Sequence, residues 1–220
     1  MKIPVYKTEG IIVGRFNANE FDRLLVVYTK EFGKILVKAK SLRKKEAKMK
    51  AQLELFNYVH LILAKGKNMD TISGVVLLDG FPRMRENLES LAAAFYIGEL
   101  LDKLIVGPER DERIWQLVLK AFNFLDRSIP QCHSDPALDA GEEFHRGRPS
   151  RSFVPLRRAQ DDNKRKAQIK ELARRFEYNL LALLGHQQEK EKKSYLEIIQ
   201  SLTGEKIESQ MFLSQVLAWG

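Results

Sequence analysis

The chain has 220 residues, of which 44% are hydrophobic and 30% are charged, a composition typical of a soluble globular protein with one large or two small domains. Its single cysteine, Cys132, excludes an internal disulfide and a zinc site built from several thiolates, and it favours a reducing compartment. The formal net charge is +8, and residues 1–80 carry 15 Lys and Arg against 8 Asp and Glu, so nearly all of the excess lies in a segment that could meet a polyanion.

No stretch of the sequence is typical of export or of membrane insertion. The amino terminus lacks the long apolar core of a signal peptide, and no uncharged apolar run approaches the roughly 20 residues that span a bilayer. We therefore expect a cytoplasmic protein without a membrane partner.

Five apolar segments predict β-strands in the first eighty residues, with no helical pattern between them. Polar turns separate the segments, and Gly33 supplies a backbone angle in one of these turns that other residues adopt reluctantly. A small closed barrel such as an OB-fold suits five strands in this length better than an open sheet. The predicted strands cover residues 11–13, 24–28, 35–39, 53–64 and 69–78.

The third predicted strand has one apolar and one basic face. Alternate residues of a strand point to opposite sides, so Ile35, Val37 and Ala39 are expected to face the core. The opposite face is basic except for one leucine, and the basic run continues into a polar segment that follows the strand. The candidate nucleic-acid-binding residues are Lys34, Lys38, Lys40, Arg43, Lys44, Lys45, Lys48 and Lys50.

This basic segment has two interpretations. Runs of charge are most often solvated loops. Here, however, the run leaves a strand whose exposed face is already basic, and single-strand binders combine a cationic groove with aromatic rings that stack on bases. We therefore predict a nucleic-acid ligand. Candidate stacking residues are Phe21, Phe32, Phe56 and Tyr58, and a place in the core is about as plausible for the last two.

The sequence contains no pattern that indicates catalysis or a cofactor. The patterns GxxxxGK[ST], HExxH and GxSxG are absent. Cys132, His133 and His145 match the spacing of no familiar metal site. We predict a binding protein with no catalytic residues, no metal and no cofactor.

Helical periodicity begins after Phe81-Pro82 and predicts an all-helical domain over residues 81–220, following the barrel domain of residues 1–80. Four prolines, two glycines and mixed charge at about 128–166 indicate a disordered linker that interrupts this domain. The predicted fold is therefore a five-stranded OB-fold barrel followed by helices. The helical stripes cover residues 88–105, 114–125, 169–184, 195–202 and 207–217.

Several short motifs, in matching order and spacing, resemble the amino-terminal domain of the bacterial RecO family of DNA repair proteins. The likeness continues through Phe81-Pro82 to about Arg127, and the segment FEYNLLALLG at residues 176–185 resembles a helix of the same family. The motifs are Thr8-Glu9-Gly10-Ile11-Ile12, Asp22-Arg23-Leu24-Leu25, Tyr28-Thr29, Phe32-Gly33-Lys34 and Ala39-Lys40 followed by Arg43.

The resemblance implies a non-catalytic protein that binds single- and double-stranded DNA and anneals complementary strands. It also implies that the protein acts with RecR to help RecA replace single-stranded DNA-binding protein, whose carboxy-terminal tail the family binds, in a cytoplasmic, nucleoid-associated location. The family's basic OB surface carries over to Lys34, Lys38, Lys40 and Arg43. Two alternatives stay open, an RNA- or ribosome-associated OB module and a non-catalytic protein adaptor.

The sequence departs from the family pattern in three places. Many members carry a four-cysteine zinc module in the helical part, which a chain with one cysteine cannot form. The insertion at 128–166 has no counterpart in the pattern, and the segment after Gly185 is shorter than usual. No residues are assigned to a site for the partner tail.

Overall fold

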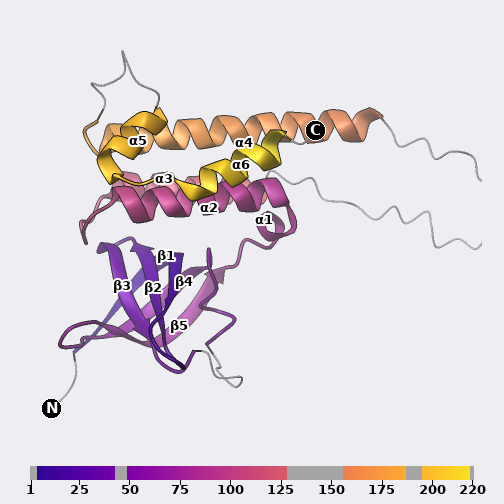
Figure 1. The fold of residues 1–220 in the computed structure, drawn as a ribbon. Helices are drawn as coiled ribbons and strands as arrows, with labels where there is room; N and C mark the ends of the chain where they lie inside the picture. Colours follow the sequence, from indigo (N-terminus) through magenta and orange to yellow (C-terminus); the bar gives the residue numbers. More distant parts are fainter. Residues whose placement is uncertain (1–3, 43–48, 128–155, 187–194, 219–220) are drawn as a thin grey trace, which may run out of the picture.

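The computed structural model of the chain describes residues 4–42, 49–127, 156–186 and 195–218. A small β-barrel lies beneath two layers of helices (Figure 1), with α2 and α3 next to the barrel and α4, α5 and α6 on their far side. The architecture is the one predicted from the sequence, an amino-terminal barrel followed by helices.

The barrel closes in the strand order β1-β2-β3-β5-β4. Neighbouring strands are antiparallel except β3 and β5, which are parallel and pair at the single position Lys38–Thr71. A five-stranded barrel of this kind is typical of an OB-fold. The strands are β1 Val5–Asn17, β2 Arg23–Thr29, β3 Gly33–Ala39, β4 Tyr58–Ala64 and β5 Thr71–Asp79.

The fourth strand begins later than predicted. Leu53 and Phe56, expected in the strand, lie in a turn that precedes it, and both are buried. Phe56 has a φ of 67°, in the left-handed region that breaks a strand. The Asn57 amide secures the turn by donating to the carbonyl oxygens of Ala51 and Gln52 at 3.0 and 2.9 Å.

The helices follow the predicted stripes, with two differences. The short helix α1 lies before the first stripe. Helix α4 begins at Leu156, inside the range predicted as linker, whereas residues 128–155 lie outside the described residues. Its first turns are rich in Arg, Asp and Lys and carry no apolar stripe, so periodicity could not reveal them. The helices are α1 Pro82–Glu86, α2 Leu88–Leu104, α3 Glu112–Arg127, α4 Leu156–Leu183, α5 Tyr195–Thr203 and α6 Glu208–Ala218.

Two apolar clusters hold the molecule together. The barrel core lies inside the barrel and includes Ile12, Leu25, Val27, Val37, Ala39, Leu61 and Leu63. The shared core joins the outer side of β1 and β2 to the helices, and it includes Ile11, Val13, Val26, Tyr28, Phe56, Ile97, Trp115, Phe122 and Phe176. Alternate residues of β1 thus serve different cores, because a strand points successive side chains to opposite sides.

Close backbone contacts fix the barrel against the helices. A Cβ on Gly33, whose φ is +66°, would lie 2.1 Å from the carbonyl oxygen of Glu109 in the α2–α3 loop. A Cβ on Gly98 of α2 would lie 3.2 Å from the carbonyl oxygen of Val13. Only glycine allows these approaches without a shift of the backbone.

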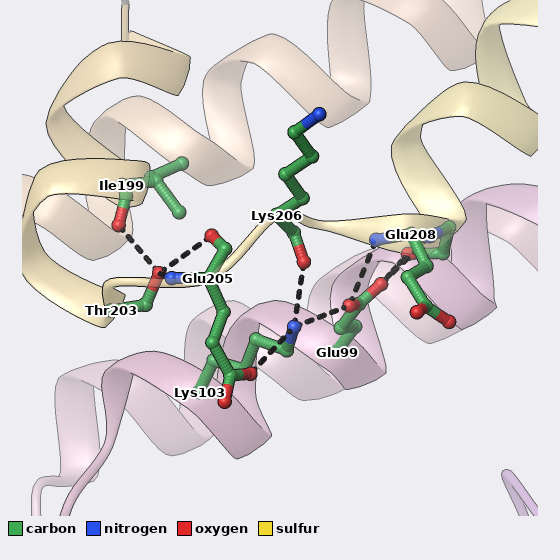
Figure 2. A network of polar contacts seen from close by, with 8 residues as sticks. Glu99, Lys103, Ile199, Thr203, Glu205, Lys206 and Glu208 are labelled. Carbon is green, nitrogen blue, oxygen red and sulfur yellow. Dashed lines mark hydrogen bonds and ion pairs between the residues drawn. The ribbon is translucent and has the colours of Figure 1, made fainter.

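A polar network seats the carboxy-terminal helix α6 on α2 (Figure 2). The Glu99 carboxylate accepts hydrogen bonds from the backbone N–H groups of Glu208 and Ser209 at 3.0 and 2.8 Å, so it caps α6 from another helix. The Lys103 ammonium lies 3.1 Å from both Glu99 and Glu205 and donates to the carbonyl oxygen of Lys206 at 2.7 Å.

Candidate nucleic-acid interface

Strand β3 shows the predicted alternation of faces. Val37 and Ala39 are fully buried in the barrel core, whereas Leu36 is 44% exposed and Lys40 is exposed on the opposite side. The lysines of β3 therefore lie on the outside of the barrel. The helices do not enclose Lys38 or Lys40, whose side chains remain half-buried and exposed respectively.

Lys34 and Lys38 already have acidic or carbonyl partners. The Lys34 ammonium donates to the carbonyl oxygen of Asp102 near the end of α2 and lies 3.5 Å from its carboxylate. The Lys38 ammonium lies 2.9 Å from the carboxylate of Asp22, in the loop between β1 and β2. A phosphate would therefore have to replace these partners at both lysines.

Asp22 organises the loop beside Lys38. Its carboxylate accepts hydrogen bonds from the Ser41 backbone N–H at 2.8 Å and from the Asn19 amide at 3.1 Å. The Ser41 N–H, then Lys38 and Asn19, lower the pKa of Asp22 to about 2. The carboxylate is therefore ionised throughout the physiological range, and it fixes the chain where it leaves β3.

The remaining candidate residues fall into two groups. Lys40 and Lys50 are exposed, and among the described residues neither forms an ion pair. The other four residues, Arg43, Lys44, Lys45 and Lys48, lie outside the described residues. Their part in binding stays a prediction.

The predicted stacking residues divide between surface and core. Phe21 and Phe32 are 47% and 37% exposed, so both rings are accessible. Of the two interpretations left open for Phe56, the structure supports the core position, because the residue is 1% exposed and packs against Phe95 and Phe122. Tyr58 is half-buried, with its hydroxyl donating to Glu9 at 2.6 Å.

The structure adds a groove that sequence analysis did not identify. It has a volume of about 840 Å³ and lies where β3 separates from β5. The turn between β4 and β5 contributes Lys65 and Lys67, and the start of β1 contributes Tyr6. The two lysines of this turn could have indicated the groove from the sequence, because the loop between strands 4 and 5 is a usual part of OB-fold binding sites.

Two further features are absent from the described residues, a metal site and a membrane-spanning helix. They contain no group of three or more His, Cys, Asp or Glu side chains that could hold a metal ion. The described helices also include none that is long and apolar enough to cross a membrane.

The closed five-stranded barrel and its lysine-bearing β3 define an OB-fold domain, a class in which the face of strands 2 and 3 and the adjoining loops commonly bind oligonucleotides. Residues 1–81 match the family model described as recombination protein O N terminal. The predicted resemblance to the RecO family is therefore confirmed.

Curated relatives extend the likeness beyond the barrel. The DNA repair protein RecO of Roseiflexus sp. is 35% identical over 126 residues, which is 57% of this chain and 44% of the relative. RecO of Dehalococcoides mccartyi is 37% identical over 123 residues, 56% of this chain and 49% of the relative. RecO of Symbiobacterium thermophilum is 30% identical over 138 residues, 63% of this chain and 54% of the relative. The chain thus matches these relatives over about half of their length.

Proposed function

We propose that this protein is a DNA-binding recombination mediator that works in DNA repair without catalysing a reaction. The observation that carries the proposal is a basic outer face, with Lys34 and Lys38 on β3 and Lys40 directly after it, on an OB barrel whose sequence matches the RecO amino-terminal family. This face binds the phosphates of DNA, which are the same in every sequence. A mediator needs such sequence-independent binding because it must act on any strand.

The ion pair at Lys38 is compatible with capture of DNA. The Lys38–Asp22 pair is partly exposed, and such pairs contribute only about 0–1 kcal/mol, so Lys38 can turn to a phosphate at little cost while Ser41 and Asn19 continue to hold Asp22. Annealing follows from the same electrostatics. A surface that neutralises two phosphate chains at once lowers the repulsion that keeps complementary strands apart.

The proposed partners are single- and double-stranded DNA, RecR and the carboxy-terminal tail of single-stranded DNA-binding protein, with RecA as an indirect partner. In this scheme the protein helps RecA to load onto strands coated by single-stranded DNA-binding protein. It works in the cytoplasm, in association with the nucleoid. The proposal rests on the likeness to RecO, over the half of each relative that the chain matches.

The salt dependence of DNA binding tests the electrostatic mechanism. If about five Lys and Arg residues contact single-stranded phosphates, log K should fall against log salt with a slope of about −3.5, from roughly 0.7 per contact. Replacing Lys38 and Lys40 with Gln should bring the slope to about −2.1, because two contacts are removed. Glutamine avoids placing a second carboxylate against Asp22.

A matched control separates this face from the net charge. Lys120→Gln with Lys206→Gln removes the same charge from exposed positions on α3 and before α6, and it should leave the slope unchanged. Both double variants should melt close to the wild type, because Lys40, Lys120 and Lys206 are exposed and the partly exposed Lys38–Asp22 pair contributes only about 0–1 kcal/mol. A wild-type slope near zero, or equal loss in both variants, would contradict the proposal.

Two alternative functions have distinct tests. An RNA-associated OB module would prefer RNA in a competition between matched DNA and RNA strands, since the 2′-hydroxyl distinguishes them. A protein adaptor would use apolar grooves between helices, such as the one that Leu88, Phe212 and Val216 line. Proteins bound to an adaptor should still be captured with it after nuclease treatment. Proteins that a DNA-binding mediator holds only through nucleic acid should be lost.

A further inference from the structure

Among the described strands, one edge of β3 is left largely unpaired, and this edge faces the groove. The strand pairs with β2 along its whole length, but with β5 at Lys38–Thr71 alone. The Lys38 backbone N–H points to this edge, where it donates to the carbonyl oxygen of Asp70 at 2.9 Å. Because alternate residues of a strand direct their N–H groups to the same edge, the N–H of Leu36 also faces the groove.

Aromatic rings form one wall of the groove. Phe32 is 37% exposed and packs edge-to-face on Tyr6, with ring centroids 5.0 Å apart. The Tyr6 hydroxyl donates to the Asp70 carboxylate at 2.5 Å, so the ring behind Phe32 is held in place. Ile35, Leu36 and Pro108 add apolar surface. The wall therefore offers an accessible ring on a fixed support.

Lysines surround the groove. The Lys65 ammonium lies 5.6 Å from the centre of the Tyr6 ring and 3.7 Å from Asp70, and Lys67 is exposed at the tip of the same turn. Lys34 adds a third ammonium, which already contacts Asp102. Asp70 is the one acidic residue among those that line the groove, and Tyr6, Gly66 and Lys65 occupy its oxygens. The rim therefore favours an anionic ligand.

We propose that this groove holds an unpaired nucleobase, which stacks on Phe32 while its flanking phosphates contact Lys65 and Lys67. The proposal rests on the DNA-binding function proposed above and adds strand selectivity to it. Base stacking on aromatic side chains and phosphate contacts to lysines are the two components of single-strand sites. A base within a duplex has both faces covered by its neighbours, so it cannot enter the groove unless it is flipped out.

Substitutions of Phe32 test the stacking step. We would measure binding of a labelled single strand and of the matching duplex by fluorescence anisotropy. Phe32→Leu keeps an apolar side chain against Tyr6 but removes the ring, so single-strand affinity should fall about tenfold and duplex affinity less than twofold. Phe32→Tyr restores a ring and should bind as the wild type does. Phe212→Leu, on α6 with a similar exposure of 40%, should change neither affinity.

The outcomes separate this inference from the function on which it rests. If the wild-type protein binds neither strand form, the proposed DNA-binding function fails. If it binds both and Phe32→Leu leaves the single-strand to duplex ratio unchanged, only the nucleobase site is overturned. Hydrogen exchange supplies a second readout, because saturating single strand should slow exchange at residues 33–37. Unchanged exchange at these residues would overturn the nucleobase site. The groove would then suit an extended acidic peptide instead.

Discussion

The folded protein disfavours the ionised form of Glu177. This residue lies half-buried on α4 and accepts a hydrogen bond from the Tyr96 hydroxyl at 2.9 Å. Burial raises the pKa of Glu177 more than Tyr96 and Arg174 lower it. A carboxyl group whose pKa is higher in the folded state stabilises the fold below its unfolded pKa, and this contribution is lost as the pH rises through the folded pKa.

Replacing Glu177 with Gln should therefore raise the melting temperature at pH 7.5. Glutamine keeps an acceptor for Tyr96 without a buried charge, and a gain of about 2–4 °C corresponds to 1 kcal/mol in a chain of this size. The difference from wild type should shrink towards pH 4, where the wild-type carboxyl is protonated. Glu171→Gln, at an exposed position of the same helix, should change little at either pH. A lower melting temperature for Glu177→Gln at pH 7.5 would mean that the attraction of Arg174 outweighs burial.

Some single residues were predictable from the sequence and others were not. The inward face of Val37 and the outward face of Lys38 followed from strand alternation alone. Phe56 was placed in a strand because aromatic residues favour strands, yet its left-handed backbone turns it into the shared core. Tyr6 and Phe32 lie 26 positions apart in the chain, and their contact depends on the closure of the barrel, which no local pattern encodes.

Helix α6 depends on a cap that another helix supplies. Burial alone would raise the pKa of Glu99, but hydrogen bonds from Ser209 and Glu208, with Lys103 nearby, bring the pKa below its ordinary value. A carboxylate with a lowered pKa stabilises the fold above its unfolded pKa, and this contribution is lost as the pH falls through the folded pKa. Acidification should therefore loosen α6 from α2.

Glu99→Gln should loosen α6 at neutral pH. The loss of a charged cap costs about 1–2 kcal/mol, which corresponds to roughly 5- to 30-fold faster amide exchange in residues 208–218. Exchange in α3 should be unaffected, because α3 takes no part in this network. Glu205→Gln is the matched control, since this side chain also contacts Lys103 but is 70% exposed. Equal effects of the two substitutions on α6 would show that Lys103, and not the cap, holds the helix.

At the scale of elements, the strength of the periodic pattern decided what the sequence could predict. Helix α3 was predictable because its apolar residues, among them Ile114, Val118 and Leu125, form one stripe. The first turns of α4 carry charge without a stripe, and the prediction began that helix too late. The cap of α6 could not be predicted, because it joins Glu99 to residues more than 100 positions further along the chain.

The whole molecule has a predicted boundary near residue 80, but the shared core crosses it. Separating the barrel from the helices would expose Ile11, Val13, Tyr28 and Phe56, each of which is buried. Each large side chain contributes about 1.5–3 kcal/mol when buried. Together these losses approach the roughly 5–15 kcal/mol that holds an entire domain folded. Neither part is therefore expected to unfold while the other stays intact.

Trp115 can report on this coupling, because its ring packs against two tyrosines of the barrel. The ring centroids of Tyr28 and Tyr58 lie 6.5 and 5.8 Å away. With Trp219→Phe to remove the second tryptophan, Trp115 fluorescence follows the barrel–helix contact while far-ultraviolet circular dichroism follows the helices. We expect both signals to change at the same urea concentration, because one core serves both parts. A fluorescence transition at lower urea would show instead that the barrel separates before the helices unfold.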